Sequence, residues 1–215
     1  MVRIFVLGTA PRLLDLDLSL LNNEITIGMN NILRSEFVPN YLCVSDGELV
    51  VRDFDYVFSD KMKDSHYYLC DHNIPAHIQL AFKNRYNVTF IPRFDREDGK
   101  YYIDPKLKTI TLTGSTSVHD LGIPLAVHLG AKEIYLLGCD SGYAHFYDTD
   151  QSYKPRFHSG FEENWPGRQG RFKHVTEILD EWNIKLYNCD PSDRLKDMEY
   201  IDFYEVISWW KFLFM

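Results

Sequence analysis

A chain of 215 residues, 45% hydrophobic and 15% aromatic, has enough apolar side chains for one well-buried core. Its net charge of -8 argues against a nucleic-acid-binding protein, because binding to many phosphates needs a basic surface. The four cysteines form no CxxC pair, which favours buried thiols in a reducing compartment over a disulfide framework or a zinc site.

Short apolar runs rich in β-branched residues alternate with helical patterns along the chain. The runs predict strands at 3–8, 24–30, 41–46, 55–59, 87–92, 133–140 and 183–190. The helical patterns predict helices at Arg12–Leu21, Pro75–Tyr86, Ser117–Leu129 and Gly170–Trp182. Strands without polar alternation are buried on both faces. The sequence therefore predicts a single α/β domain over residues 1–215, Rossmann-like and doubly wound, with a mostly parallel sheet and helices on both faces.

Two segments stand outside this alternation. Residues 143–170 are polar and aromatic, which is typical of a lid-like functional loop. Residues 202–215 are apolar, and we interpret them as a helix that docks on the core or supports a homo-oligomer. Asp202 and Glu205 argue against a membrane-surface helix. With no apolar run of about 18 residues and no signal peptide, the sequence predicts a cytoplasmic protein without a transmembrane segment.

Small, amide and carboxylate residues follow several of the predicted strands. They occur at 8–11, 28–31, 45–47, 138–140 and 188–191. Each group alone is an ordinary turn or helix cap. Because parallel strands end at one edge of a sheet, where ligands bind, their shared placement predicts a binding site there.

The first of these turns argues against two common nucleotide sites. It contains one glycine, Gly8, whereas a dinucleotide fingerprint needs three, and the chain has no P-loop. Residues 113–117 read either as an anion-binding helix start or as an ordinary capped helix. The spacing of His66, Asp71, His72 and His77 matches no known metal motif, so we predict no metal site.

Taken together, these motifs resemble a known family. "GTAPRLLDLDLSLLNNEITIGMNNI" is similar to its first motif and "TGSTSVHDLGIPLAVHLGAKEIYLLGCDSGY" to its second, while "HFYD" and "NIKLYNCDPSDRL" are similar to its closing elements. The family groups MptE-type hydroxymethyl-dihydropterin pyrophosphokinases with motility accessory factors. It is similar in turn to bacterial sialyltransferases that use CMP-sialic acid.

The resemblance implies a site for a cytidine or other nucleotide phosphate. The implied nucleotide-binding residues are Gly8, Thr9, Ala10, Arg12, Asn30, Asp46 (or Ser45), Ser115, Thr116, Ser117, Gly138 and Asp140. It also implies that Tyr143 or Tyr147 assists the departing phosphate and that His145 or His158 is the base. Thr9-Ala10 replaces the Asn-Gly of the family, and Arg12 replaces a serine. Arg12 offers a bidentate phosphate contact instead.

Three functional hypotheses remain open at this point. The leading one is a glycosyltransferase that needs no cofactor, takes a CMP-activated acidic sugar as donor and acts on a glycan acceptor. The second is a pyrophosphokinase that uses ATP and Mg²⁺, with Asp46 and Asp140 as metal ligands. The third is a nucleotide-binding protein without catalysis, since function resides in sites and not in folds.

Overall fold

The computed structural model describes residues 2–45, 47–52, 63–71, 74–91, 118–139, 146, 165–191, 195 and 197–213. Its strands are β1 (Arg3–Leu7), β2 (Ile25–Met29), β3 (Tyr41–Val44), β4 (His66–Cys70), β5 (Asn87–Ile91), β6 (Glu133–Leu137), β7 (Lys185–Asn188) and β8 (Glu199–Tyr200). Its helices are α1 (Gly47–Arg52), α3 (Ala76–Arg85), α4 (Ile123–His128), α5 (Trp165–Glu181) and α6 (Phe203–Leu213), with 3-10 helices η1 (Pro11–Asp15), η2 (Leu18–Leu21) and η3 (Asn30–Ser35) and a π-helix η5 (Val118–Gly122).

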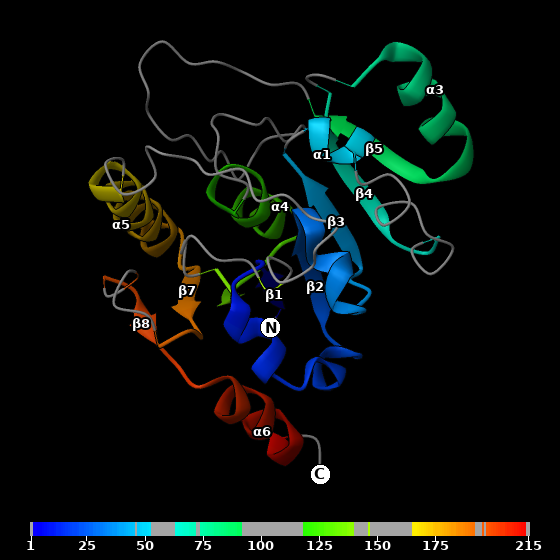
Figure 1. Ribbon diagram of the computed structural model, residues 1–215. Coiled ribbons are helices and arrows are strands. Elements are labelled where there is room, and N and C mark those ends of the chain that lie inside the picture. The colour runs from blue at the N-terminus through cyan, green and yellow to red at the C-terminus, as the bar shows by residue number, and fades with distance from the viewer. Residues whose placement is uncertain are drawn as a thin grey trace.

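In the described part of the chain, the strands form one eight-stranded sheet in the order β5-β4-β3-β2-β1-β6-β7-β8. Every strand pair in it is parallel. The predicted doubly wound α/β fold is therefore confirmed. Figure 1 shows α4 and α5 on one side of the sheet and α6 on the other.

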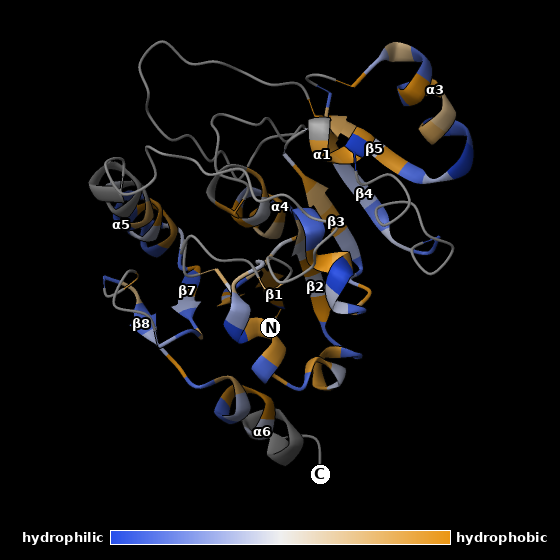
Figure 2. Ribbon diagram, viewed as in Figure 1, coloured by the Kyte–Doolittle hydropathy of each residue, from blue (hydrophilic) through white to orange (hydrophobic). Residues whose placement is uncertain are grey.

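Successive residues of a strand point to opposite faces, and the two sides of the core follow this alternation. Ile4 and Val6 pack with residues of α4 and α5, whereas Phe5 and Leu7 pack with residues of η1, η3 and α6. All five residues of β1 are buried, as expected for a central strand. In Figure 2 the hydrophobic colour follows β2, whereas β8 at the sheet edge is hydrophilic.

Several boundaries differ from the prediction. The helix expected at Arg12–Leu21 is two 3-10 helices, because Asp17 accepts a hydrogen bond from the N–H of Ser19 at 3.1 Å and caps a new turn there. α5 begins at Trp165, within the segment expected to be a lid. The strand expected at 55–59 and most of the lid lie outside the described residues.

All four cysteines are buried free thiols, as the sequence predicts. Burial raises the pKa of Cys43, and burial followed by the charge of Asp190 raises the pKa of Cys189. None of the helices in the described ranges has the length and apolar character needed to span a bilayer.

Candidate functional site

The candidate site lies at the carboxyl edge of β2, β1 and β6, where the order of the strands changes direction. From β1 the chain adds β2 to β5 on one side and then places β6 on the other side of β1. Leu7, at the end of β1, pairs with Gly28 of β2 and Leu137 of β6, so the three strands end at one level. Ligands of open parallel sheets bind at this kind of edge.

The turn after β1 is attached directly to the turn after β6. The N–H of Gly8 donates to the carbonyl of Leu137 at 2.7 Å, and the N–H of Ala10 donates to the carbonyl of Gly138 at 3.0 Å. A Cβ on Gly8 would lie 2.1 Å from the Gly138 oxygen. Glycine is therefore required at position 8, and the two turns form one packed unit.

Ala10 fits this unit without strain. Its φ of -64° and ψ of 149° are ordinary for any residue, and it is only 4% exposed. Pro11 follows as the first residue of η1 and has no N–H group. Because the N–H groups of Gly8 and Ala10 already donate to carbonyls of the β6 turn, neither is available to a phosphate at this turn.

Asn30 begins η3 directly after β2 and adopts a positive φ of 48°. Its side-chain oxygen accepts a hydrogen bond from the N–H of Ser45 at 3.4 Å, which links the ends of β2 and β3. The neighbouring Asn31 is 2% exposed, and its amide nitrogen has no hydrogen-bond partner. An unpaired buried donor costs about 1–3 kcal/mol. The sequence placed Asn31 only among the residues that follow a strand, and its burial and unpaired amide nitrogen are seen only in the structure.

Arg12 is exposed and lies in η1. Partial burial, and then the negative charge of Asp202 and the Cys189 side chain, raise the pKa of the Tyr200 hydroxyl. The positive charge of Arg12 opposes this rise. Arg12 therefore lies within electrostatic range of Tyr200, at the same carboxyl edge as the first turn.

Phe146 also returns to the first turn. Its N–H donates to the carbonyl of Thr9 at 3.0 Å, and its side chain is buried at 8% exposure. A residue that follows β6 by several positions is thus hydrogen-bonded to the turn that follows β1. This hydrogen bond connects the segment after β6 to the turn after β1.

The structure gathers six of the implied nucleotide-binding residues at this edge, namely Gly8, Thr9, Ala10, Arg12, Asn30 and Gly138. Ser45, the alternative to Asp46, is described and donates its N–H to Asn30. The remaining implied residues lie outside the described ranges: Asp46, Ser115, Thr116, Ser117, Asp140, Tyr143, His145, Tyr147 and His158. Among the described residues no group of three His, Cys, Asp or Glu side chains is arranged to hold a metal ion.

Asp190 and Asn188, at the end of β7, were noted in the sequence only as residues after a strand. Both are 2% exposed, and Asp190 accepts a hydrogen bond from the N–H of Cys139 at 2.9 Å. Leu136 pairs with Asn188, so Asp190 is level with Gly138. The sequence shows the two residues two positions apart after a predicted strand, but the contact of Asp190 with the β6 turn follows only from the register of β6 and β7.

An open groove of 510 Å³ lies elsewhere, between η1–η2 and the segment after η3. Its lining includes Leu14, Asp17, Glu36 and Phe37. None of the implied nucleotide-binding residues contributes to it. The groove is therefore distinct from the carboxyl-edge site.

His66, from the histidine-rich stretch of the sequence, occupies the first position of β4. Its ring stacks on Tyr68 with centroids 4.6 Å apart, and its Nε2 forms a 2.8 Å hydrogen bond with the Thr89 hydroxyl. Burial lowers the pKa of His66 from its ordinary value of 6.5. The neutral ring is therefore the form that the fold prefers.

This preference predicts a pH effect on stability. As the pH falls through about 6.5, the unfolded chain gains a proton at His66 that the folded chain resists, so the free energy of unfolding falls. We expect His66→Gln, which cannot titrate, to lose less melting temperature than the wild type between pH 7.5 and pH 5.5. The exposed His77→Gln is the matched histidine control. Parallel losses in the wild type and His66→Gln would contradict this prediction.

Neither the protein-family models nor the curated proteins include a match to this chain. Solved structures do match it. The sialyltransferase CstII from Campylobacter jejuni, in complex with the substrate analogue CMP-3FNeuAc, is similar at a TM-score of 0.57 and 18% identity, over 93% of this chain and 86% of that one. CstII with a trisaccharide acceptor and CMP is similar at a TM-score of 0.56 and 15% identity, over 92% and 85%.

The MAf glycosyltransferase from Magnetospirillum magneticum AMB-1 matches at a TM-score of 0.55 and 13% identity, over 93% of this chain and 33% of that one. At these identities the matches establish a shared fold. The chain therefore has the sialyltransferase-like glycosyltransferase fold. The expected resemblance to MptE-type enzymes finds no counterpart among the matches described.

Proposed function

We propose that this protein is a glycosyltransferase that uses a CMP-activated acidic sugar as donor. One observation carries the proposal: six of the implied nucleotide-binding residues, those that the structure describes there, lie at the carboxyl edge of β2, β1 and β6. They do so in a fold that matches a CMP-3FNeuAc complex over 93% of the chain. A second CstII complex holds CMP with a trisaccharide acceptor, which supports a glycan as the acceptor class.

In this proposal the donor phosphate lies against the turn after β1. The N–H groups of Gly8 and Ala10 are engaged by the β6 turn, so the hydroxyl of Thr9 and the guanidinium of Arg12 supply the contacts. A guanidinium binds two phosphate oxygens at once and stays charged at any physiological pH. Asn30, which is held toward the end of β3, contacts the nucleotide from the adjacent strand.

The proposed reaction is direct displacement without a metal ion. The acceptor hydroxyl oxygen forms a bond to the anomeric carbon of the sugar, while the bond from that carbon to the phosphate oxygen of CMP breaks. His145 or His158 takes the hydroxyl proton. Tyr143 and the helix start at Ser117 stabilise the negative charge on the departing CMP. The surface-glycan role belongs to this proposal as well.

Calorimetric titrations with CMP, CDP, ATP and GTP, each with and without Mg²⁺, test the nucleotide assignment. CMP or CDP binding that needs no metal is the expected result. Binding of ATP alone, and only with Mg²⁺, would replace the proposal by the pyrophosphokinase. The absence of binding by all four would remove the nucleotide site. Release of CMP from a CMP-activated acidic sugar, lost when His145 and His158 are both replaced by alanine, then tests the transfer step.

Arg12→Met is predicted to weaken CMP binding about tenfold or more. A hydrogen bond to a charged group contributes about 1.5–3 kcal/mol, and Arg12 is the charged residue that we assign to the phosphate. The matched control is Arg85→Met, which removes an exposed arginine from the end of α3. Equal CMP affinities of the two variants would contradict the role of Arg12.

A further inference from the structure

A pair of buried polar side chains ends β7 and shapes the segment that follows. The amide nitrogen of Asn188 donates to the carbonyl of Asp190 at 2.6 Å, and the N–H of Asp190 donates to the side-chain oxygen of Asn188 at 3.0 Å. These two bonds fix the backbone of Asp190. Its carboxylate is then held against β6, where it accepts the N–H of Cys139.

A carboxylate that is 98% buried is costly, so its placement calls for an explanation. One group that it binds is the N–H of Cys139, at the end of the β6 turn. That turn contains Gly138 in a positive φ of 62°, where an added Cβ would lie 3.1 Å from the Cβ of Leu13 in η1. Asp190 therefore stabilises a turn whose backbone conformation leaves little freedom.

The β6 turn in turn holds the first turn. Through the carbonyls of Leu137 and Gly138 it accepts the N–H groups of Gly8 and Ala10. The Cys139 thiol adds a hydrogen bond to the Leu137 carbonyl at 3.3 Å. A displacement of the β6 turn by a few tenths of an ångström would thus move the backbone on either side of Thr9.

We propose that Asp190 is a positioning residue of the nucleotide site. It acts through the Cys139 N–H and the Gly138 carbonyl to fix the first turn in the conformation that binds the phosphate of CMP. The proposal rests on the proposed function in one respect, namely that this turn holds CMP. The proposal assigns Asp190 no direct contact with the ligand.

Three variants separate positioning from general stability. Asp190→Ala removes the acceptor of the Cys139 N–H. Asp190→Asn keeps an oxygen acceptor and is the conservative variant. The matched control is Thr26→Val, which removes a hydroxyl that is 1% exposed and bonded to Asn40 near the start of β2, away from the carboxyl edge.

Calorimetric titration with CMP is the first measurement. We expect Asp190→Ala to raise the Kd at least tenfold, Asp190→Asn to restore most of the affinity, and Thr26→Val to bind within twofold of the wild type at a comparable loss of melting temperature. Equal affinities of Asp190→Ala and Thr26→Val would overturn the proposal. If Asp190→Ala does not fold, the test rests on Asp190→Asn, which retains an oxygen that can accept the Cys139 N–H. A folded Asp190→Asn variant without measurable CMP binding would also overturn the proposal.

Amide hydrogen exchange keeps this test separate from the proposed function. We expect the amides of Ala10 and Cys139 to exchange at least tenfold faster in Asp190→Ala than in Thr26→Val, whether or not CMP binds. Failure of the wild type to bind CMP would refute the nucleotide assignment alone. Unchanged exchange at both amides would refute the positioning role alone.

Discussion

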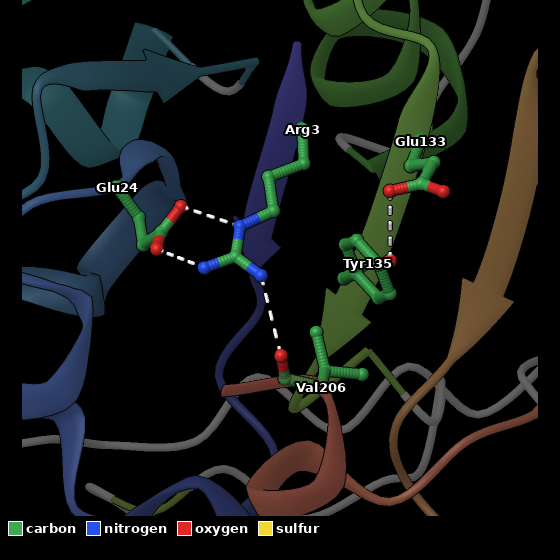
Figure 3. A network of polar contacts seen from close by, with 5 residues as sticks. All are labelled: Arg3, Glu24, Glu133, Tyr135 and Val206. Carbon is green, nitrogen blue, oxygen red and sulfur yellow. Dashed lines mark hydrogen bonds and ion pairs between the residues drawn. The ribbon is translucent and has the colours of Figure 1, made fainter. Parts of the chain in front are cut away.

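Arg3→Met is expected to lower the free energy of unfolding by about 3 kcal/mol or more, because it leaves the Glu24 carboxylate largely buried without its partner. Arg3 is 7% exposed in β1. Its Nε donates to Glu24 at 2.7 Å, a second nitrogen forms an ion pair with the same carboxylate, and a third donates to the carbonyl of Val206 in α6 at 3.2 Å. Figure 3 shows these contacts converging on one guanidinium. Urea unfolding measures the loss.

The same guanidinium lies 5.5 Å from the centre of the Phe5 ring. Through Glu24 and Val206, Arg3 connects β1 with the turn before β2 and with α6. The double variant Arg3→Met with Glu24→Leu is expected to regain most of the loss, since no charge is then left buried. Lys185→Met breaks an exposed ion pair with Asp180 and is expected to change stability little. An effect of Arg3→Met as small as that of Lys185→Met would contradict the argument.

The sequence predicted the parallel core because its central strands are apolar on both faces. The five buried residues of β1 and the run at β6 carry that signal directly. β4 is absent from the predicted strands because its sequence, HYYLC, begins with a histidine and two tyrosines and was considered only as part of a histidine-rich stretch without a metal motif. Tyr67 is nevertheless fully buried, in a position created by β3, β5 and α3. Burial of this kind depends on neighbours far along the chain.

The site was predictable to the extent that it follows from parallel topology. Residues after parallel strands must meet at one edge, which is why Gly8, Asn30 and Gly138 are found together. The contacts between them depend on strand order and register. The sequence gives no sign that Ala10 donates to Gly138 or that Asp190 accepts from Cys139, because each partner is fixed by the fold as a whole.

The second large effect is expected for Gly8→Ala. The added methyl group would lie 2.1 Å from the Gly138 carbonyl oxygen and 3.0 Å from the Cys139 sulfur. The nearest atom belongs to the backbone, so a side-chain rotation cannot relieve the overlap, and the turns after β1 and β6 must separate. We expect a loss of about 2–3 kcal/mol in the free energy of unfolding, at the upper end for an overpacked core site.

Gly8→Ala should also weaken CMP binding more than tenfold, because separation of the two turns breaks the hydrogen bonds that Gly8 and Ala10 donate. Gly170→Ala is the matched control, since a Cβ at that position in α5 meets nothing within 4 Å. Alanine in a helix is favoured over glycine, so the control is expected to gain up to about 1 kcal/mol. Urea unfolding and CMP titration of both variants decide the matter. A Gly8→Ala protein as stable as wild type, with intact CMP affinity, would show that the two turns can separate at no cost. The conclusion that they form one rigid unit, on which the nucleotide site depends, would then be wrong.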